Sequence, residues 1–117
     1  MAIVLLGTNL EASELTVLEQ LHMDAEQLRA FSVSVKKDPI FKGMVALMTC
    51  NRIEWYIDTP NPKKAEVLFC QKWAAFVGIK NEVLYATVTL KQDHEAITHL
   101  FEVVCGLKSM VFGENEI

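Results

Sequence analysis

The chain lacks the features that mark membrane, disulfide-rich and nucleic-acid-binding proteins. The apolar run near its start, residues 3–6, is far shorter than the ~20 residues of a membrane span, and it lacks the charged flank of a signal peptide. Three cysteines without a Cys-x-x-Cys pair fit neither a simple disulfide set nor a zinc pattern. A net charge of −4 argues against a generic nucleic-acid binder, because phosphate affinity comes mainly from Lys and Arg. We expect reduced thiols in a cytoplasmic protein.

Glycine and proline are also scarce, and no repeat is present, so little of the chain can be linker. The 117 residues, 51% hydrophobic and 22% charged, predict one domain with a real core. They contain no glycine-rich dinucleotide fingerprint, so any dinucleotide domain that the chemistry needs lies outside them. Residues 106–117 are apolar and glycine-punctuated without a polar tail, from which we expect the natural chain to continue.

The hydrophobic pattern predicts strands and helices in alternation. Strands are expected over residues 3–7, 44–48, 53–57 and 83–90, the last from its β-branched residues. Helices are expected over residues 15–21, from the capping box Asp24/Gln27 to Pro39, from Pro62 to Gly78, and from an Asp93 cap to about Gly106. This order predicts an α+β protein with the split βαβ, or ferredoxin-like, fold (βαββαβ). We expect an antiparallel four-stranded sheet with two helices on one face.

The additional C-terminal helix is apolar around most of its circumference, which is typical of a helix buried on more than one side. It either lies across the open face of the sheet or docks on a missing domain. Its apolar residues are Ala96, Ile97, Leu100, Phe101, Val103 and Val104.

Residues 48–56 carry the most chemistry. In a regular strand, residues two apart share a face at roughly 6.6 Å. The polar face would carry Cys50, Arg52, Glu54 and Tyr56, and the apolar face Ile53, Trp55 and Ile57. We expect the apolar face to meet the helices and the polar face to look outward. Arg52 would favour a reactive thiolate, or would hold a carboxylate while Glu54 orients it. A lone cysteine at a strand end is also commonly a small buried hydrophobe, and both readings stay open.

The remaining thiols and imidazoles are less informative. Cys70 and Cys105 lie in apolar helical patterns and are expected in the core. His99 is either a satisfied helix histidine or a proton donor or acceptor aimed at the Cys50 face. It shares the polar strip of the last helix with Glu95, Thr98 and Glu102. No two histidines stand four residues apart, so we expect no metal site.

At these residues the chain resembles a known family, the glutamyl-tRNA reductases. In this chain, the segment that resembles the family's nucleophile motif is Thr49-Cys50-Asn51-Arg52-x-Glu54-x-Tyr56. A second signature resembles His99-Leu100-Phe101-x-Val103-x-x-Gly106-Leu107-x-Ser109-Met110-Val111-x-Gly113-Glu114-x-x-Ile117. Gly7-x-Asn9 agrees more weakly. The two signatures lie about fifty residues apart, in order and in register, and the resemblance spans the whole chain.

The resemblance implies that residues 1–117 are an N-terminal catalytic, glutamyl-tRNA-binding domain. The family reduces glutamate esterified to its tRNA to glutamate 1-semialdehyde, the first committed step toward tetrapyrroles such as haem. The NADPH-binding and dimerisation domains would follow this segment, so the fragment alone would not complete the reduction. The resemblance further implies a homodimer when full-length, hand-over of the aldehyde to the next pathway enzyme, no metal and no membrane partner.

The resemblance also implies roles for single residues. Cys50 would attack the ester and leave a thioester for hydride reduction, and His99 would assist proton steps or position the substrate. Arg52 would pair with the glutamate carboxylate. The other pocket residues would be Thr49, Asn51, Glu54, Ser109, Glu114, Asn115 and Glu116.

The chain departs from the usual pattern of the family at several positions. Leu10 and Lys91 stand where His is common, Glu14 where Pro is expected, and Leu18 where Arg is expected. Asn115-Glu116 replaces Pro-Gln, and Glu116 sets a negative charge where a neutral amide would face an anionic glutamate. Two other hypotheses stay open: a non-catalytic ferredoxin-like ligand-binding or regulatory module, and a family member that has lost activity.

Overall fold

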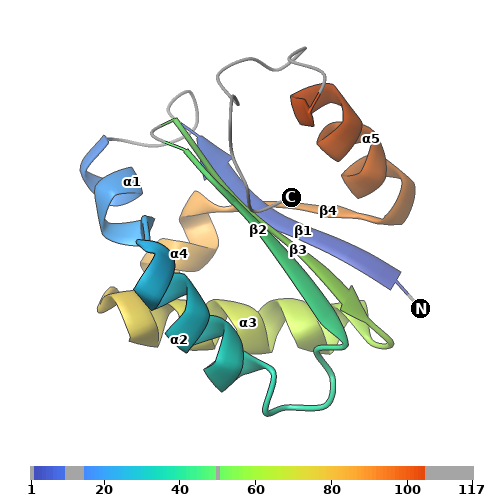
Figure 1. Ribbon diagram of the computed structural model, residues 1–117, viewed down its shortest axis with the longest axis horizontal. Coiled ribbons are helices and arrows are strands. Elements are labelled where there is room, and N and C mark those ends of the chain that lie inside the picture. The colour runs from blue at the N-terminus through green and yellow to red at the C-terminus, as the bar shows by residue number, and fades with distance from the viewer. Residues whose placement is uncertain (1, 10–14, 50, 105–117) are drawn as a thin grey trace.

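A four-stranded sheet with helices on both faces forms the frame of the protein (Figure 1). The computed structural model describes residues 2–9, 15–49 and 51–104. Its elements are β1 (Ala2–Asn9), α1 (Leu15–Leu21), α2 (Ala25–Val35), β2 (Gly43–Met48), β3 (Arg52–Thr59), α3 (Pro62–Val77), α4 (Asn81–Thr87), β4 (Thr89–Gln92) and α5 (Asp93–Val104). Among these described elements, none of the helices is both long and apolar enough to cross a bilayer.

The strand order confirms the predicted fold class. The sheet runs β2-β3-β1-β4, and each neighbouring pair is antiparallel. Strands β1 and β2 are therefore separated by β3, and β3 and β4 by β1, which is the interleaving of the split βαβ fold. The same pairing sets Glu54 of β3 opposite Gly7 of β1, and Lys91 of β4 opposite Leu5 of β1.

Helices α1 to α4 cover one face of the sheet and bury the main core against it (Figure 1). As expected, Ile53, Trp55 and Ile57 of β3 point into this core and are almost fully buried. Trp55 packs with aromatic rings of α2 and α3 at centroid distances between 5.3 and 6.5 Å, in tilted and edge-to-face arrangements. Each such pair adds about 0.5–1.5 kcal/mol beyond the burial of its apolar area.

Local signals set the helix ends as predicted. The Asp24 carboxylate accepts the Gln27 N–H at 2.8 Å, and the Gln27 side chain accepts the Asp24 N–H at 2.9 Å, so the capping box is complete. Pro62 is the first residue of α3, behind an Asn61 side-chain cap. Gly78 ends α3 with φ of 81°, a left-handed conformation that a side chain would strain.

The prediction of a strand over residues 83–90 was wrong for residues 83–87 and right for residues 89–90. Residues Asn81–Thr87 form α4, and β4 is confined to Thr89–Gln92. Leu84 is fully buried in the main core, where α4 packs against α3, and the Thr87 hydroxyl donates to the Val83 carbonyl at 2.7 Å. Tertiary burial therefore outweighs the β propensity of Val83 and Thr87. With α1 and α4 added to α2 and α3, four helices rather than the expected two cover this face.

Helix α5 lies across the other face and packs on β1 and β4 (Figure 1). This settles the alternative that the sequence left open. Ala96 is fully buried against Leu5 and Tyr56, whereas Ile97 is 45% exposed. The expectation of a helix buried on more than one side was thus wrong for the side chains described. Asp93 also differs from its predicted capping role: it has φ of 49°, and its carboxylate accepts the Ile3 N–H at 3.1 Å, which ties the start of α5 to β1.

Candidate active site

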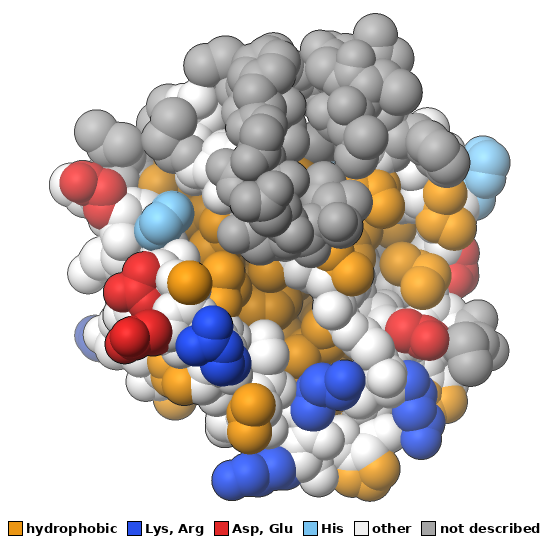
Figure 2. Space-filling model, viewed as in Figure 1, with side chains coloured by type: hydrophobic (Ala, Val, Ile, Leu, Met, Phe, Trp, Pro, Cys, Tyr) orange, Lys and Arg blue, Asp and Glu red, His pale blue; other side chains and the backbone are white. Residues whose placement is uncertain are grey.

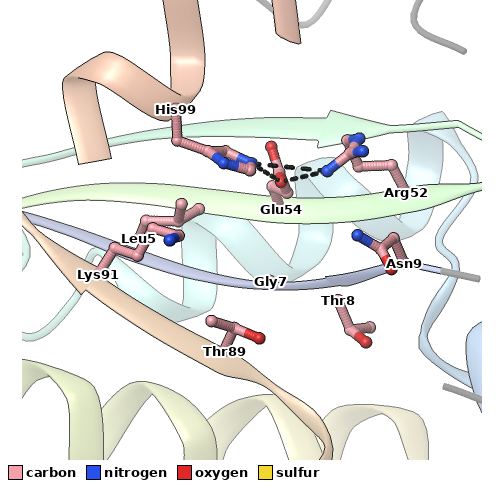
Figure 3. Close-up of a pocket in the computed structure, with 9 residues that line it drawn as sticks. All are labelled: Leu5, Gly7, Thr8, Asn9, Arg52, Glu54, Thr89, Lys91 and His99. Atoms are coloured by element: carbon pink, nitrogen blue, oxygen red, sulfur yellow. Dashed lines mark hydrogen bonds and ion pairs between the residues drawn. The ribbon is translucent and has the colours of Figure 1, made fainter. Parts of the chain in front are cut away.

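The strand alternation gathers polar residues of three strands beneath α5. On β3, Arg52, Glu54 and Tyr56 alternate with the core residues and therefore face α5. Their cross-strand partners on β1 are Asn9, Gly7 and Leu5, and the β4 residues opposite Gly7 and Leu5 are Thr89 and Lys91. Figure 3 shows His99 descending from α5 onto this surface beside Glu54.

Glu54 is the centre of a buried hydrogen-bonded cluster. Its Oε2 accepts from Arg52 Nη1 at 3.0 Å and contacts His99 Nε2 at 2.5 Å, and its Oε1 accepts from the Tyr56 hydroxyl at 2.9 Å (Figure 3). Glu54 is 3% exposed, Arg52 7% and His99 8%. Burial, followed by the neighbouring Glu54 carboxylate, raises the pKa of Tyr56 well above its ordinary value, so this phenol stays a donor at neutral pH.

The contacts of Glu54 define the tautomer of His99. A carboxylate only accepts hydrogen bonds, so the contact requires the hydrogen of the neutral ring on Nε2. Arg52 Nη1 lies 3.5 Å from His99 Nε2. In this tautomer both nitrogens are donors, and both donate to the same oxygen, Glu54 Oε2. His99 Nδ1 is buried and has no hydrogen-bond partner among the residues that the structure describes. In this tautomer the lone pair of Nδ1 is the ring's acceptor for a proton.

Gly7 makes room for the Glu54 side chain. A Cβ at position 7 would fall 2.7 Å from Glu54 Cγ and 2.9 Å from the Ile53 carbonyl oxygen, closer than real Cβ atoms approach. Glycine inside a strand is typical of such close approaches. The sequence singled out Gly7 only as a weak family signal, and it placed Tyr56 on the right face without a role. Tyr56 stands two residues after Glu54 and so shares its strand face, a spacing that could have suggested a hydrogen bond from the Tyr56 hydroxyl to the Glu54 carboxylate.

A pocket of about 160 Å³ lies over this part of the sheet. That is close to the ~150 Å³ of a cavity that admits benzene and below the ~300 Å³ at which drug-sized sites begin. It suits a small acyl group and does not fit a dinucleotide. Its described lining residues are Leu5, Gly7, Thr8, Asn9, Arg52, Glu54, Thr89, Lys91 and His99 (Figure 3).

The hairpin turn between β2 and β3 is organised by Thr49. Its hydroxyl accepts the N–H groups of Asn51 and Arg52 at 3.1 and 3.0 Å, and its own N–H donates to the Arg52 carbonyl at 2.8 Å. Thr49 is buried. Its hydroxyl thus supports the backbone of the turn that carries residue 50.

The structure brings together some of the predicted site residues. Arg52, Glu54 and His99 meet directly, and Thr49 and Asn51 lie in the adjacent turn. The expectation that the polar face looks outward was wrong, because α5 covers it and buries Arg52 and Glu54. Six predicted residues lie outside the described ones: Cys50, Cys105, Ser109, Glu114, Asn115 and Glu116.

Cys70, the cysteine that the structure describes, lies in the main core and away from the Glu54 cluster. Cys70 is fully buried in the main core, as predicted, and burial, followed by the nearby Glu66 carboxylate, raises its pKa to about 12. It is therefore a protonated, inert thiol at neutral pH. Across residues 2–9, 15–49 and 51–104, no three His, Cys, Asp or Glu side chains are grouped so as to hold a metal ion.

Fold and site together define a class of protein: a split βαβ domain with a small polar pocket beside a buried cluster of arginine, glutamate and histidine. The family model described as "Glutamyl-tRNAGlu reductase, N-terminal domain" matches residues 6–117. The chain belongs to this family of glutamyl-tRNA reductase N-terminal domains.

Individual relatives agree with this assignment. The chain is 30% identical to the glutamyl-tRNA reductase of Thermobifida fusca (strain YX), over 100% of this chain and 24% of that protein. It is 32% identical to the one of Streptomyces coelicolor (strain ATCC BAA-471 / A3(2) / M145), over 100% of this chain and 20% of that protein. The solved glutamyl-tRNA reductase from Methanopyrus kandleri superposes with a TM-score of 0.66 at 28% identity, covering 96% of this chain and 24% of that one. The chain thus spans about a quarter or less of the length of these relatives.

Proposed function

We propose that this chain is the catalytic domain of a glutamyl-tRNA reductase and that it transfers the glutamyl group of glutamyl-tRNA to Cys50. The observation that carries the proposal is the buried Glu54 cluster, which holds Arg52 and His99 together next to the turn bearing Cys50. Family membership supports the substrate, and the small pocket supports an acyl group of the size of glutamyl.

The proposed step is an acyl transfer in which one bond forms and one bond breaks. The Cys50 thiolate attacks the ester carbonyl carbon, a C–S bond forms, and the C–O bond to the terminal ribose of the tRNA breaks. The ribose oxygen leaves with a proton as a hydroxyl group, and the glutamyl group remains as a thioester. His99, through Nδ1, is the group that takes this proton from the Cys50 thiol and gives it to the leaving ribose oxygen.

NADPH belongs to the proposed full reaction but not to this pocket. A dinucleotide does not fit about 160 Å³, and the sequence has no glycine-rich fingerprint for one. When bound, the cofactor supplies the hydride that turns the thioester into glutamate 1-semialdehyde. We place it on a domain beyond residues 1–117, together with the dimerisation domain of a cytoplasmic homodimer that hands the aldehyde to the next enzyme.

Most contact with tRNA is assigned to other parts of the enzyme. The chain carries a net charge of −4. On the face seen in Figure 2, basic side chains lie apart from one another, and acidic side chains stand beside several of them. A tRNA-binding surface normally gathers its cations into a continuous patch.

The test is covalent trapping with radiolabelled glutamyl-tRNA. The wild-type chain is expected to retain acid-stable, thiol-labile glutamate, and Cys50→Ala to retain none. Cys70→Ala, the matched control, should be labelled like wild type, because its thiol is buried and protonated. Equal labelling of wild type and Cys50→Ala would contradict the proposal. Cys50 that is alkylated no faster than Cys70 would favour the alternative, a non-catalytic ligand-binding module.

A further inference from the structure

Asp93 joins β4 to α5 without an intervening loop. Strand β4 ends at Gln92 and α5 begins at the next residue, so a single position redirects the chain from the sheet onto its covered face (Figure 1). The φ of Asp93 is 49°, and among the residues that the structure describes it is the one non-glycine residue with a positive φ. A side chain in this left-handed region is strained, and the surrounding contacts must maintain the conformation.

The side chain of Asp93 replaces a hydrogen bond that the end of β4 gives up. The β1–β4 register pairs Val4 with Gln92, and its continuation sets residue 93 opposite Ile3. The backbone turns away at that point, and the Ile3 N–H donates to Asp93 Oδ1 at 3.1 Å instead of to a further ladder carbonyl. The left-handed backbone therefore turns α5, while the carboxylate ties its first residue to β1.

His99 lies on the side of α5 that faces the sheet, a short way beyond this tie. Ala96 and His99 follow Asp93 at intervals of three, a spacing at which helical residues are neighbours on one face. Ala96 is fully buried against the sheet, and its small side chain allows a close approach of the helix. The distance from residue 93 to residue 99 along the axis is about 9 Å, so the direction of the first turn decides where the imidazole lies.

The contact between His99 and Glu54 spans a neighbouring strand. Among the described elements α5 packs mainly on β1 and β4, whereas Glu54 lies on β3, on the other side of β1. A small change in the direction of α5 would therefore move His99 Nε2 away from the Glu54 carboxylate. A misplacement of ~1 Å far from the chemistry can slow a reaction by about 10²-fold.

We propose that Asp93 is a positioning residue for His99. Its left-handed backbone and its bond to Ile3 set the direction of α5 and thereby hold the imidazole against Glu54. The consequence for catalysis rests on the proposed function, in which His99 moves the proton. Asp93 itself is exposed and is not among the lining residues of the 160 Å³ pocket, so it acts through His99 and not on the acyl group.

The first experiment observes His99 directly by NMR of the 117-residue chain, without substrate. The Nε2 hydrogen is buried and bonded to Glu54, so wild type is expected to show a slowly exchanging imidazole N–H signal that is absent from His99→Gln. Asp93→Asn keeps an acceptor oxygen and tolerates the left-handed region, and it should retain the signal. Asp93→Ala lacks the acceptor and is strained at a φ of 49°, and it should lose the signal.

The second experiment measures the rate at which glutamyl-tRNA acylates Cys50. Asp93→Ala is expected to slow acylation by about 10–10²-fold, and Asp93→Asn should restore most of the rate. In the His99→Gln background, Asp93→Ala should cause no further slowing, because two residues that act through one group are not additive. Asp24→Ala is the matched control: its carboxylate also accepts a backbone N–H, at 2.8 Å, but it caps α2 on the other face of the sheet, so the rate should stay that of wild type.

An Asp93→Ala chain that keeps the His99 signal or the wild-type rate overturns the inference. Equal slowing by Asp93→Ala with and without His99 does so too, as does an Asp93→Asn chain that behaves like Asp93→Ala or a wild-type chain without the signal. Failure of the proposed function has a different signature, namely wild type in which Cys50 stays unlabelled. In that case the NMR comparison still decides whether Asp93 positions the imidazole.

Discussion

Glu54 lies directly opposite Gly7 across the β1–β3 pair, and its side chain occupies the space that a side chain at position 7 would need. The missing side chain on β1 thus allows a carboxylate of β3 to lie flat over the sheet. From there, Glu54 reaches Arg52 on its own strand and His99 on α5. One glycine therefore supports the arrangement of the whole cluster.

Replacing Gly7 by alanine is expected to displace Glu54 or separate β1 from β3. The new Cβ would lie 2.7 Å from Glu54 Cγ, and overpacking of this kind costs about 1–3 kcal/mol. Urea unfolding should show this loss, and trapping of the glutamyl group on Cys50 should fall with it. Gly43→Ala is the matched control, because a Cβ there lies 3.8 Å from Asp58 Cβ, an ordinary contact. Equal stability of the two variants would refute the steric argument.

Glu54→Gln is expected to be among the most destabilising isosteric changes in the chain. It removes the negative charge that compensates buried Arg52, and breaking a buried pair from one side costs about 3–5 kcal/mol. Tyr56→Phe, which deletes a single hydrogen bond to the same carboxylate, should cost only about 1 kcal/mol. Denaturant unfolding measures both. A Glu54→Gln chain as stable as Tyr56→Phe would show that the charge pair contributes little.

The faces of β3 could be predicted from the sequence because strand alternation is a geometric constraint. Ile53, Trp55 and Ile57 had to share a side, and Arg52, Glu54 and Tyr56 the other. The position of α5 could not be predicted, since an apolar helix indicates that it is buried but not against what. Its docking on β1 and β4 is what buries the polar face and brings His99 to Glu54, which lies 45 residues away in sequence.

Two further features depended on tertiary context. Val83 and Thr87 favour a strand by propensity, but burial of Leu84 in the main core makes their segment helical. Lys91 enters the pocket only because β4 pairs with β1 in the register that sets it opposite Leu5. A shift by one residue would turn its side chain to the other face of the sheet, and no local pattern specifies that register.

The neutral imidazole of His99 is expected to carry its hydrogen on Nε2, because Glu54 accepts there. Long-range ¹H–¹⁵N correlation spectra of the imidazole distinguish this tautomer from the Nδ1–H form. His99→Gln can still donate to Glu54 from its amide but lacks a basic nitrogen, so it should remain folded and acylate Cys50 about 10²–10⁴-fold more slowly. An Nδ1–H signal, or full acylation by His99→Gln, would remove His99 from the proton transfer.

The stability of the protein should fall at alkaline pH because of Cys70. Its folded-state pKa of about 12 lies above the ordinary pKa of 9.0 for a cysteine thiol, so between these values the unfolded chain has lost a proton that the folded chain keeps. The free energy of unfolding from this group is therefore fully present below about pH 9 and decreases by up to about 1.4 kcal/mol per pH unit above it. Urea unfolding from pH 8 to 11 should show a steeper decline for wild type than for Cys70→Ala. Identical slopes would mean that the thiol titrates alike in both states, contrary to its complete burial among the helices.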